Sequence, residues 1–263
     1  MRTTRTNRAW VASIAVAVTT LAAAHLLIAT PSAEAKPRCF GKKATITGTN
    51  GRDKLTGTPR KDVIVARGGN DVVQAKSNDD RVCLGTGNDF AGTSRGFDKI
   101  DGGDGADEMH GGGRAGRRDP RDGDKIIGGD GDDFLDGTRG ELKDKLDAGP
   151  GDDFLQGGEF ADAGPGNDEV DADGHVSESH PDRILAGPGD DVVFGDRGGS
   201  ENEIHGGAGN DELNGSGADD RLFGDEDDDL LFGFGGNDAL DGGLGTDTCD
   251  QAGGAGTLLN CEL

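Results

Sequence analysis

Polar and apolar residues follow one another along this chain with a period of nine. Aspartates recur, mostly nine residues apart, and an apolar residue such as Leu55, Ile64 or Val73 stands two positions after nearly every one. The positions of this series are Asp53, Asp62, Asp71, Asp80, Asp89, Asp98, Asp107, Asp124, Asp133, Asp144, Asp153, Asp168, Asp182, Asp191, Asn202, Asp211, Asp220, Asp229, Asp238 and Asp247. A solvated run of charges would carry no apolar residue in register, so the pattern predicts a repeating, partly buried structure.

A period of nine fits neither a helix of 3.6 residues per turn nor strands joined by hairpins. It fits a strand of about three residues, whose central apolar side chain points inward, followed by a six-residue turn. Two such units make one coil, and stacked coils give an all-β fold, a parallel β-solenoid. Each strand then pairs with the strand two repeats further along the chain. Asp53, Asp71, Asp89 and Asp107 are expected on one edge, and Asp62, Asp80 and Asp98 on the other.

The composition does not support an ordinary globular core. Only 32% of the 263 residues are hydrophobic, 4% are aromatic, 50 are glycine, and the formal net charge is −24. Chains of this kind stay disordered unless a ligand contributes to folding. The negative charge argues against nucleic acid and anionic membranes as partners, and it favours cations.

Calcium is the cation that suits such turns. Stacked turns offer carboxylates and backbone carbonyls, and calcium takes six to eight oxygen ligands with flexible geometry. Magnesium requires a tighter octahedron, and zinc prefers nitrogen and sulfur. The sequence therefore predicts several calcium ions between stacked turns, with metal binding coupled to folding.

The repeats also resemble a known family. The pattern G-G-x-G-x-D-x-U-x is complete at 102–110, 128–136 and 206–214, and close variants occur at 148–156, 163–171, 186–194 and 242–250. Over about residues 48–250 the chain resembles haemolysin-type (RTX) calcium-binding repeat proteins. The resemblance implies a parallel β-roll whose turn carbonyls and aspartates bind calcium. It assigns to the metal Asp53, Asp71, Asp89, Gly102, Asp107, Gly128, Asp133, Asp153, Asp168, Asp191, Gly206, Asp211, Asp220, Asp229, Asp238 and Asp247.

Four turns depart from the pattern. The segments "AKSNDD" (75–80) and "TSRGFD" (93–98) have lost most of the glycines, and "SESHPD" (177–182) and "RGGSEN" (197–202) also depart from the pattern. We expect strands beside these turns but poor or absent metal sites within them.

The N-terminus predicts export. Arg2, Arg5 and Arg8 precede an apolar run, and Ala33 and Ala35 form an A-x-A cleavage site, so residues 1–35 are typical of a secretory signal peptide. The alternative is an uncleaved membrane anchor. Cleavage changes the net charge from −24 to −26, because the segment carries three arginines and one glutamate. We expect no membrane insertion after cleavage and a secreted, extracellular or surface-associated location; the resemblance implies a bacterium.

The remaining chain divides into an N-terminal cap (36–47), the repeat array (48–250, with loop insertions near 112–124 and 171–182) and a C-terminal cap (251–263). Four cysteines in an exported chain predict two disulfides, and three pairings are open. We favour Cys39 with Cys83 and Cys249 with Cys261, because each pair then lies at one end of the array. No C-x-x-C spacing supports a zinc site.

Three functions follow from these features. The first is a secreted calcium-binding protein with a structural or buffering role. The second is an adhesin-like binder that presents loops such as 112–124, with its four arginines, to a cell-surface or extracellular partner. The third, more remote, is a secreted hydrolase on a β-solenoid. No nucleophile is expected beside His110 or His205, and no segment is long enough for a separate catalytic domain, so the sequence does not predict an enzyme.

Overall fold

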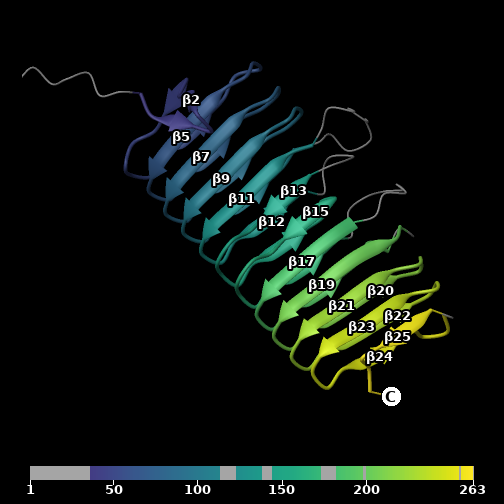
Figure 1. The fold of residues 1–263 in the computed structure, drawn as a ribbon. Coiled ribbons are helices and arrows are strands. Elements are labelled where there is room, and N and C mark those ends of the chain that lie inside the picture. The colour runs from purple at the N-terminus through teal and green to yellow at the C-terminus, as the bar shows by residue number, and fades with distance from the viewer. Residues whose placement is uncertain are drawn as a thin grey trace, which may run out of the picture. The chain divides into compact units, whose positions relative to one another are not determined.

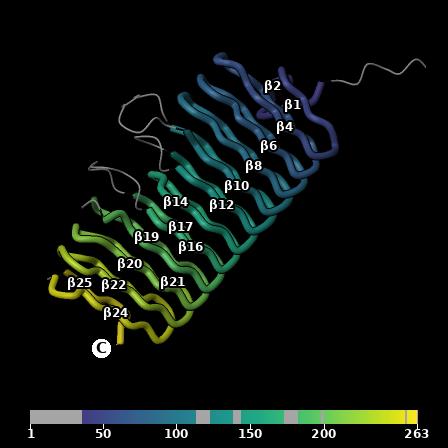
Figure 2. Tube along the Cα trace, turned by 180° about the vertical axis from the view of Figure 1, so that it is seen from behind, coloured from purple at the N-terminus to yellow at the C-terminus, as the bar shows by residue number. Residues whose placement is uncertain are grey.

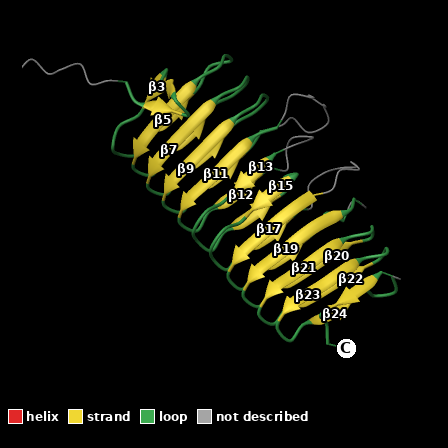
Figure 3. Cartoon of the chain, in the orientation of Figure 1, coloured by secondary structure: helices red, strands yellow, loops and turns green. Residues whose placement is uncertain are grey.

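The structure of the protein is a computed structural model, which describes residues 36–112, 123–137, 144–172, 182–197, 200–254 and 256–262. The predicted signal peptide, most of the 112–124 insertion with its arginines, and most of the 171–182 insertion lie outside these ranges. All regular structure in the described ranges is β-strand (Figure 3). Within them, no helix has the length and apolar character of a membrane span.

From Lys36 onward the chain winds into two long parallel sheets that face each other. Figure 1 shows one sheet toward the viewer and Figure 2 shows the other. The twelve-stranded sheet contains β3 (Ile46–Thr47), β5 (Val63–Gly68), β7 (Arg81–Thr86), β9 (Lys99–Asp104), β11 (Lys125–Asp130), β13 (Lys145–Asp147), β15 (Phe160–Asp162), β17 (Asp182–Pro188), β19 (Asn202–Ala208), β21 (Arg221–Glu226), β23 (Ala239–Leu244) and β25 (Thr257–Leu259).

The eleven-stranded sheet lies opposite. It contains β4 (Lys54–Thr56), β6 (Val72–Gln74), β8 (Phe90–Gly92), β10 (Glu108–His110), β12 (Phe134–Asp136), β14 (Phe154–Gln156), β16 (Glu169–Asp171), β18 (Val192–Phe194), β20 (Glu212–Ser216), β22 (Leu230–Phe234) and β24 (Thr248–Asp250). Successive strands along the chain alternate between the two sheets, so each pair of strands makes one coil. The predicted parallel β-solenoid is confirmed.

The core is one column of apolar side chains from each sheet. The central residue of each short strand points inward and pairs with its equivalent on the next coil, as Met109 does with Leu135 and Ile100 with Ile126. These side chains are fully buried. Burying each large aliphatic side chain contributes about 1.5–3 kcal/mol. Apolar residues at the first position of several turns, such as Ala66, Leu84 and Ala148, are also fully buried and belong to the same core.

The two edges of the solenoid differ. We call the turns that lead from the twelve-stranded to the eleven-stranded sheet the regular edge, and the returning turns the variable edge. Every turn on the regular edge keeps the nine-residue spacing between inward residues, as from Ile126 to Leu135. All insertions fall on the variable edge. Equivalent positions on successive coils therefore have a sequence separation of 18 near both ends, but of 26, 20, 15, 23 and 20 in the middle.

The sequence pattern did not predict strand β15. In β15 the inward residue is Ala161, and only Gly157, Gly158 and Glu159 connect this strand to β14. Glu159 stands where the series would place an aspartate, and the turn is shortened, so the nine-residue spacing is lost. The coil still closes because the paired strands keep their register with Leu146.

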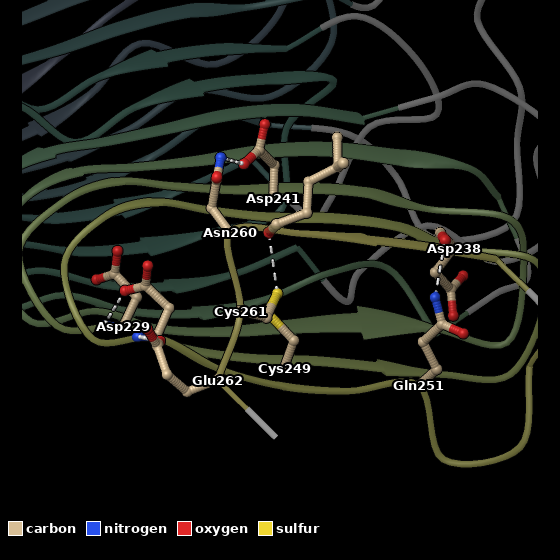
Figure 4. Close-up of a disulfide and its surroundings, with 10 residues drawn as sticks. Asp229, Asp238, Asp241, Cys249, Gln251, Asn260, Cys261 and Glu262 are labelled. Atoms are coloured by element: carbon tan, nitrogen blue, oxygen red, sulfur yellow. Dashed lines mark hydrogen bonds between the residues drawn. A yellow bond between two sulfur atoms is a disulfide. The ribbon is translucent and has the colours of Figure 1, made fainter.

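Both predicted disulfides are present. Cys39, the last residue of β1 (Arg38–Cys39), which pairs antiparallel with β2 (Lys42–Lys43), bonds to Cys83 with a Cα–Cα distance of 5.7 Å. Cys249 bonds to Cys261, also at 5.7 Å, and closes the last coil (Figure 4). Around it, Asn260 Nδ2 donates to Asp241 Oδ1 at 2.7 Å. Each disulfide therefore ties down one end of the stack.

We predict that Leu135→Ala lowers the free energy of unfolding of the calcium-saturated protein by about 2–5 kcal/mol, because the change leaves a cavity in a fully buried column. Urea denaturation followed by circular dichroism measures the loss. The control is Leu244→Ala, at a side chain that is 71% exposed, with an expected change within about 0.5 kcal/mol. Equal losses in the two variants would contradict the described core.

Candidate metal sites

The regular edge consists of eleven six-residue turns, and each ends in an aspartate. The aspartates are Asp53, Asp71, Asp89, Asp107, Asp133, Asp153, Asp168, Asp191, Asp211, Asp229 and Asp247. They include eleven of the thirteen aspartates predicted to bind metal; Asp220 and Asp238 lie on the variable edge. The structure thus brings most of the predicted ligands into one column.

A carboxylate ladder runs along this column. The backbone N–H of each aspartate donates to Oδ1 of the aspartate on the next coil; the N–O distance from Asp107 to Asp133, for example, is 2.7 Å. The ten contacts from Asp53 to Asp247 span 2.6–3.0 Å. Asp247 N then donates to Glu262 Oε2 at 2.6 Å. The nine-residue pattern gave no sign of Glu262, which occupies the next place in the ladder.

The second carboxylate oxygen of nearly every one of these aspartates is buried without a hydrogen-bond partner in the described part of the chain. The ten residues concerned are Asp71, Asp89, Asp107, Asp133, Asp153, Asp168, Asp191, Asp211, Asp229 and Asp247. A buried polar atom left unpaired costs about 1–3 kcal/mol, and more when it is charged. Ten such oxygens in one column therefore favour a bound ligand that supplies positive charge.

Burial makes these carboxylates hard to ionise when no cation is bound. Desolvation, partly opposed by the backbone hydrogen bond from the preceding coil, raises the pKa of Asp107, Asp133 and Asp211 to about 7. The same causes raise the pKa of Asp89 and Asp229 to about 6. The environment is thus unfavourable to bare negative charge.

Carbonyl oxygens face the same space. A Cβ built on Gly102 would overlap both Asp107 Oδ2 and the carbonyl oxygen of Gly128, on the next coil. A Cβ on Gly128 would overlap Asp133 Oδ2 and the carbonyl oxygen of Ala148. Oxygens of two successive turns therefore border one small volume at the first position of the turn. Gly206 repeats the arrangement with the next coil.

This donor set fits calcium. No three His, Cys, Asp or Glu side chains in the described ranges converge on one point, so side chains alone would not hold a metal. Carboxylate and backbone carbonyl oxygens together are ligands that calcium accepts at flexible geometry. Bound there, the ion would supply the positive charge that the buried carboxylates lack.

The variable edge has a broken ladder. One run of backbone-to-Oδ1 contacts links Asp62, Asp80, Asp98, Asp124 and Asp144, and another links Asn202, Asp220 and Asp238. Between the two runs lie the three-residue turn and the second insertion. The turns at 75–80 and 93–98 have lost most of their glycines, yet they keep the aspartate in place, and Asp80 Oδ2 is buried and unpaired among described residues.

Three turns satisfy the second carboxylate oxygen with a hydroxyl residue. Thr49 donates from N and Oγ1 to Asp53 Oδ2, at 2.6 and 2.9 Å. Thr58 does the same for Asp62, and Ser216 for Asp220. The assignment of Asp53 and Asp220 to metal stays a prediction, but their carboxylates differ from those of the ten-residue column. The signal in the sequence was Gly-Thr or Gly-Ser at the start of the turn.

These features define a class of protein: a parallel β-solenoid whose glycine-rich turns stack acidic oxygens between coils. The family model of the RTX calcium-binding nonapeptide repeat matches the chain at residues 56–91, 85–113, 121–141, 143–163, 181–200, 197–231 and 214–249. The matches cover more than half of the chain, which therefore belongs to the RTX calcium-binding nonapeptide repeat family. No curated protein matches the chain. The predicted family, fold and calcium-binding character are confirmed.

We predict that Gly129→Ala destabilises the calcium-saturated protein by at least about 1–3 kcal/mol. Gly129 has a φ of +118°, and a Cβ there would overlap the carbonyl oxygen of Gly103. Urea denaturation at saturating calcium measures the loss.

The control is Gly217→Ala, in a turn of the variable edge. Gly217 is not at positive φ, and beyond its chain neighbours no atom lies within 4 Å of where its Cβ would be. We expect a loss below about 1 kcal/mol. The same loss in both variants would show that the turn at Gly129 does not have the described backbone.

Proposed function

We propose that this calcium-binding β-roll protein is secreted, binds calcium chiefly along its regular edge, and uses the metal to hold its own fold. The observation that carries the proposal is the column of ten buried carboxylates, each with one oxygen lacking a partner in the described part of the chain. Calcium between successive turns would pair with that oxygen and with carbonyls such as those of Gly102 and Gly128. On this proposal the regular edge takes about ten ions, one for each such carboxylate.

Repulsion along the edges supports coupling between metal and fold. Each aspartate lies one strand spacing, about 4.8 Å, from its neighbours on the adjoining coils. Removing the metal leaves these charges facing one another in a chain of net charge −24 with only 32% hydrophobic residues. The chain therefore lacks the apolar surface to offset both the repulsion and the entropy of ordering. We infer that metal-free protein is largely unfolded between its disulfide-bonded ends.

The proposed role is structural. Calcium would be available outside the cell, where the pattern of residues 1–35 would direct the chain, and a bacterial origin follows from the resemblance alone. Calcium buffering is an accompanying property rather than a separate function, because the same sites would release ions only as coils unfold. Catalysis is not part of the proposal.

Calcium titration of metal-free protein, with disulfides intact and residues 1–35 removed, tests this proposal. We expect circular dichroism to change from disorder to β structure as about ten ions bind, and we expect magnesium not to reproduce the change. Bound metal is counted by equilibrium dialysis in the same samples. A chain that is folded in chelator, or that binds at most one ion, would refute the proposal.

The ligand assignment has its own test. We predict that Asp133→Asn lowers the number of bound ions by at least one, because it removes charge from a carboxylate whose second oxygen has no protein partner among described residues. The matched control is Asp62→Asn, where Thr58 already donates two hydrogen bonds to that oxygen. We expect the control to keep the full number of ions. An unchanged count in Asp133→Asn would remove this column from the calcium sites.

A further inference from the structure

The outer face of the eleven-stranded sheet has a gap in one row of side chains. The third residues of β6, β8 and β10 are in register, in the order Gln74, Gly92 and His110. Because Gly92 has no side chain, the space between its neighbours is open. The Phe90 ring borders this space, with Cε1 3.8 Å from where a Cβ of Gly92 would lie.

The gap is part of a cavity of about 400 Å³ at the corner between this sheet and the variable edge. Its lining includes Gln74, Lys76, Phe90, Gly92, Ser94 and His110. This size lies within the range of small-molecule sites, about 300–1,000 Å³. We call it the outer pocket.

The turns that lost the repeat pattern supply the polar side of the outer pocket. Lys76 belongs to "AKSNDD" and Ser94 to "TSRGFD", where complete repeats place glycine. Loss of glycine in these turns has therefore put a cation and a hydroxyl in the lining of one cavity. The side chains of Gln74, Lys76 and Ser94 make no hydrogen bond with the described part of the chain, and so they are available to a ligand.

The aromatic side of the outer pocket is held firmly. His110 Nδ1 lies 2.8 Å from Asp136 Oδ2, and Nε2 lies 2.8 Å from Glu108 Oε1. The ring of His110 is 5.4 Å from that of Phe90. These contacts fix the ring plane and leave an aromatic wall opposite the amide of Gln74.

We propose that the outer pocket binds one neutral sugar unit of a polysaccharide. The C–H face of a pyranose carries a weak positive potential that is attracted to the negative face of an aromatic ring such as Phe90. The amide of Gln74, the hydroxyl of Ser94 and the ammonium of Lys76, which line the same cavity, can hydrogen-bond to the hydroxyls of a sugar. The net charge of the whole chain, −24, disfavours an acidic sugar. This inference does not depend on the number or position of calcium ions.

Binding is tested on calcium-saturated protein by saturation-transfer NMR and titration calorimetry. The probes are the methyl glycosides of glucose, galactose, mannose and N-acetylglucosamine, with methyl glucuronide as the charged comparison. We expect at least one neutral glycoside to bind and the glucuronide to bind more weakly. No binding by any neutral glycoside, or binding of the glucuronide alone, would overturn the proposal.

Gly92→Leu is the decisive variant, because its backbone is not at positive φ and the new side chain would fill the outer pocket. We expect it to weaken binding by about tenfold or more. The control is Gln156→Leu, which adds the same side chain to the same outward row, on β14. Circular dichroism and the count of bound calcium should match the unchanged protein in both variants. Equal sugar affinity in Gly92→Leu and Gln156→Leu would exclude this cavity as the site.

Discussion

The fold depends on the hydrogen bonds that one aspartate carboxylate makes in each turn. Oδ1 of the aspartate accepts the backbone N–H of the preceding coil, and this contact sets the stacking of turns; Asp107 and Asp133 illustrate it at 2.7 Å. The same contact draws the second oxygen into the interior, where the described part of the chain offers it no donor in ten of the turns. A side chain that is necessary for stacking is therefore also the main obstacle to it until a cation is present. The fold and the metal chemistry of this protein follow from the same atoms.

The two edges resolve this conflict differently. On the regular edge the second oxygen stays unpaired among described residues in ten of the eleven turns, at unchanged spacing, which suits a uniform row of ions. The variable edge avoids it in places, since Thr58 and Ser216 donate to the carboxylate themselves and a three-residue turn omits it. The variable-edge turns at 75–80 and 93–98 depart from the repeat, and their residues Lys76 and Ser94 border a cavity. The uniform turns of the regular edge stack the coils, whereas the irregular turns of the variable edge differ from one another in their contacts.

Much of the architecture could be predicted from the sequence because one inward residue and one aspartate recur in each strand and turn. The register and the column on the regular edge follow from that spacing. The favoured pairing of the cysteines, one pair at each end of the array, is the one observed. β15 could not be predicted, because Glu159 replaces the aspartate and the shortened turn removes the nine-residue spacing. Glu262 could not be predicted from the nine-residue spacing, because the chain passes through a disulfide-closed loop before Glu262 accepts a hydrogen bond from Asp247. The hydroxyl-bound carboxylates of Asp53 and Asp220 depend on contacts across four residues, which spacing alone does not report.

The variable edge joins its strands with as few as three residues, after β14, and as many as fourteen, after β10. The paired strands keep their register on both sides of each change. Lengthening a surface connection costs little free energy, since the entropy of closing it grows only with the logarithm of its length. New segments can therefore be gained or lost on this side during evolution, or grafted by design, while the sheets and the opposite row of turns remain under unchanged selection.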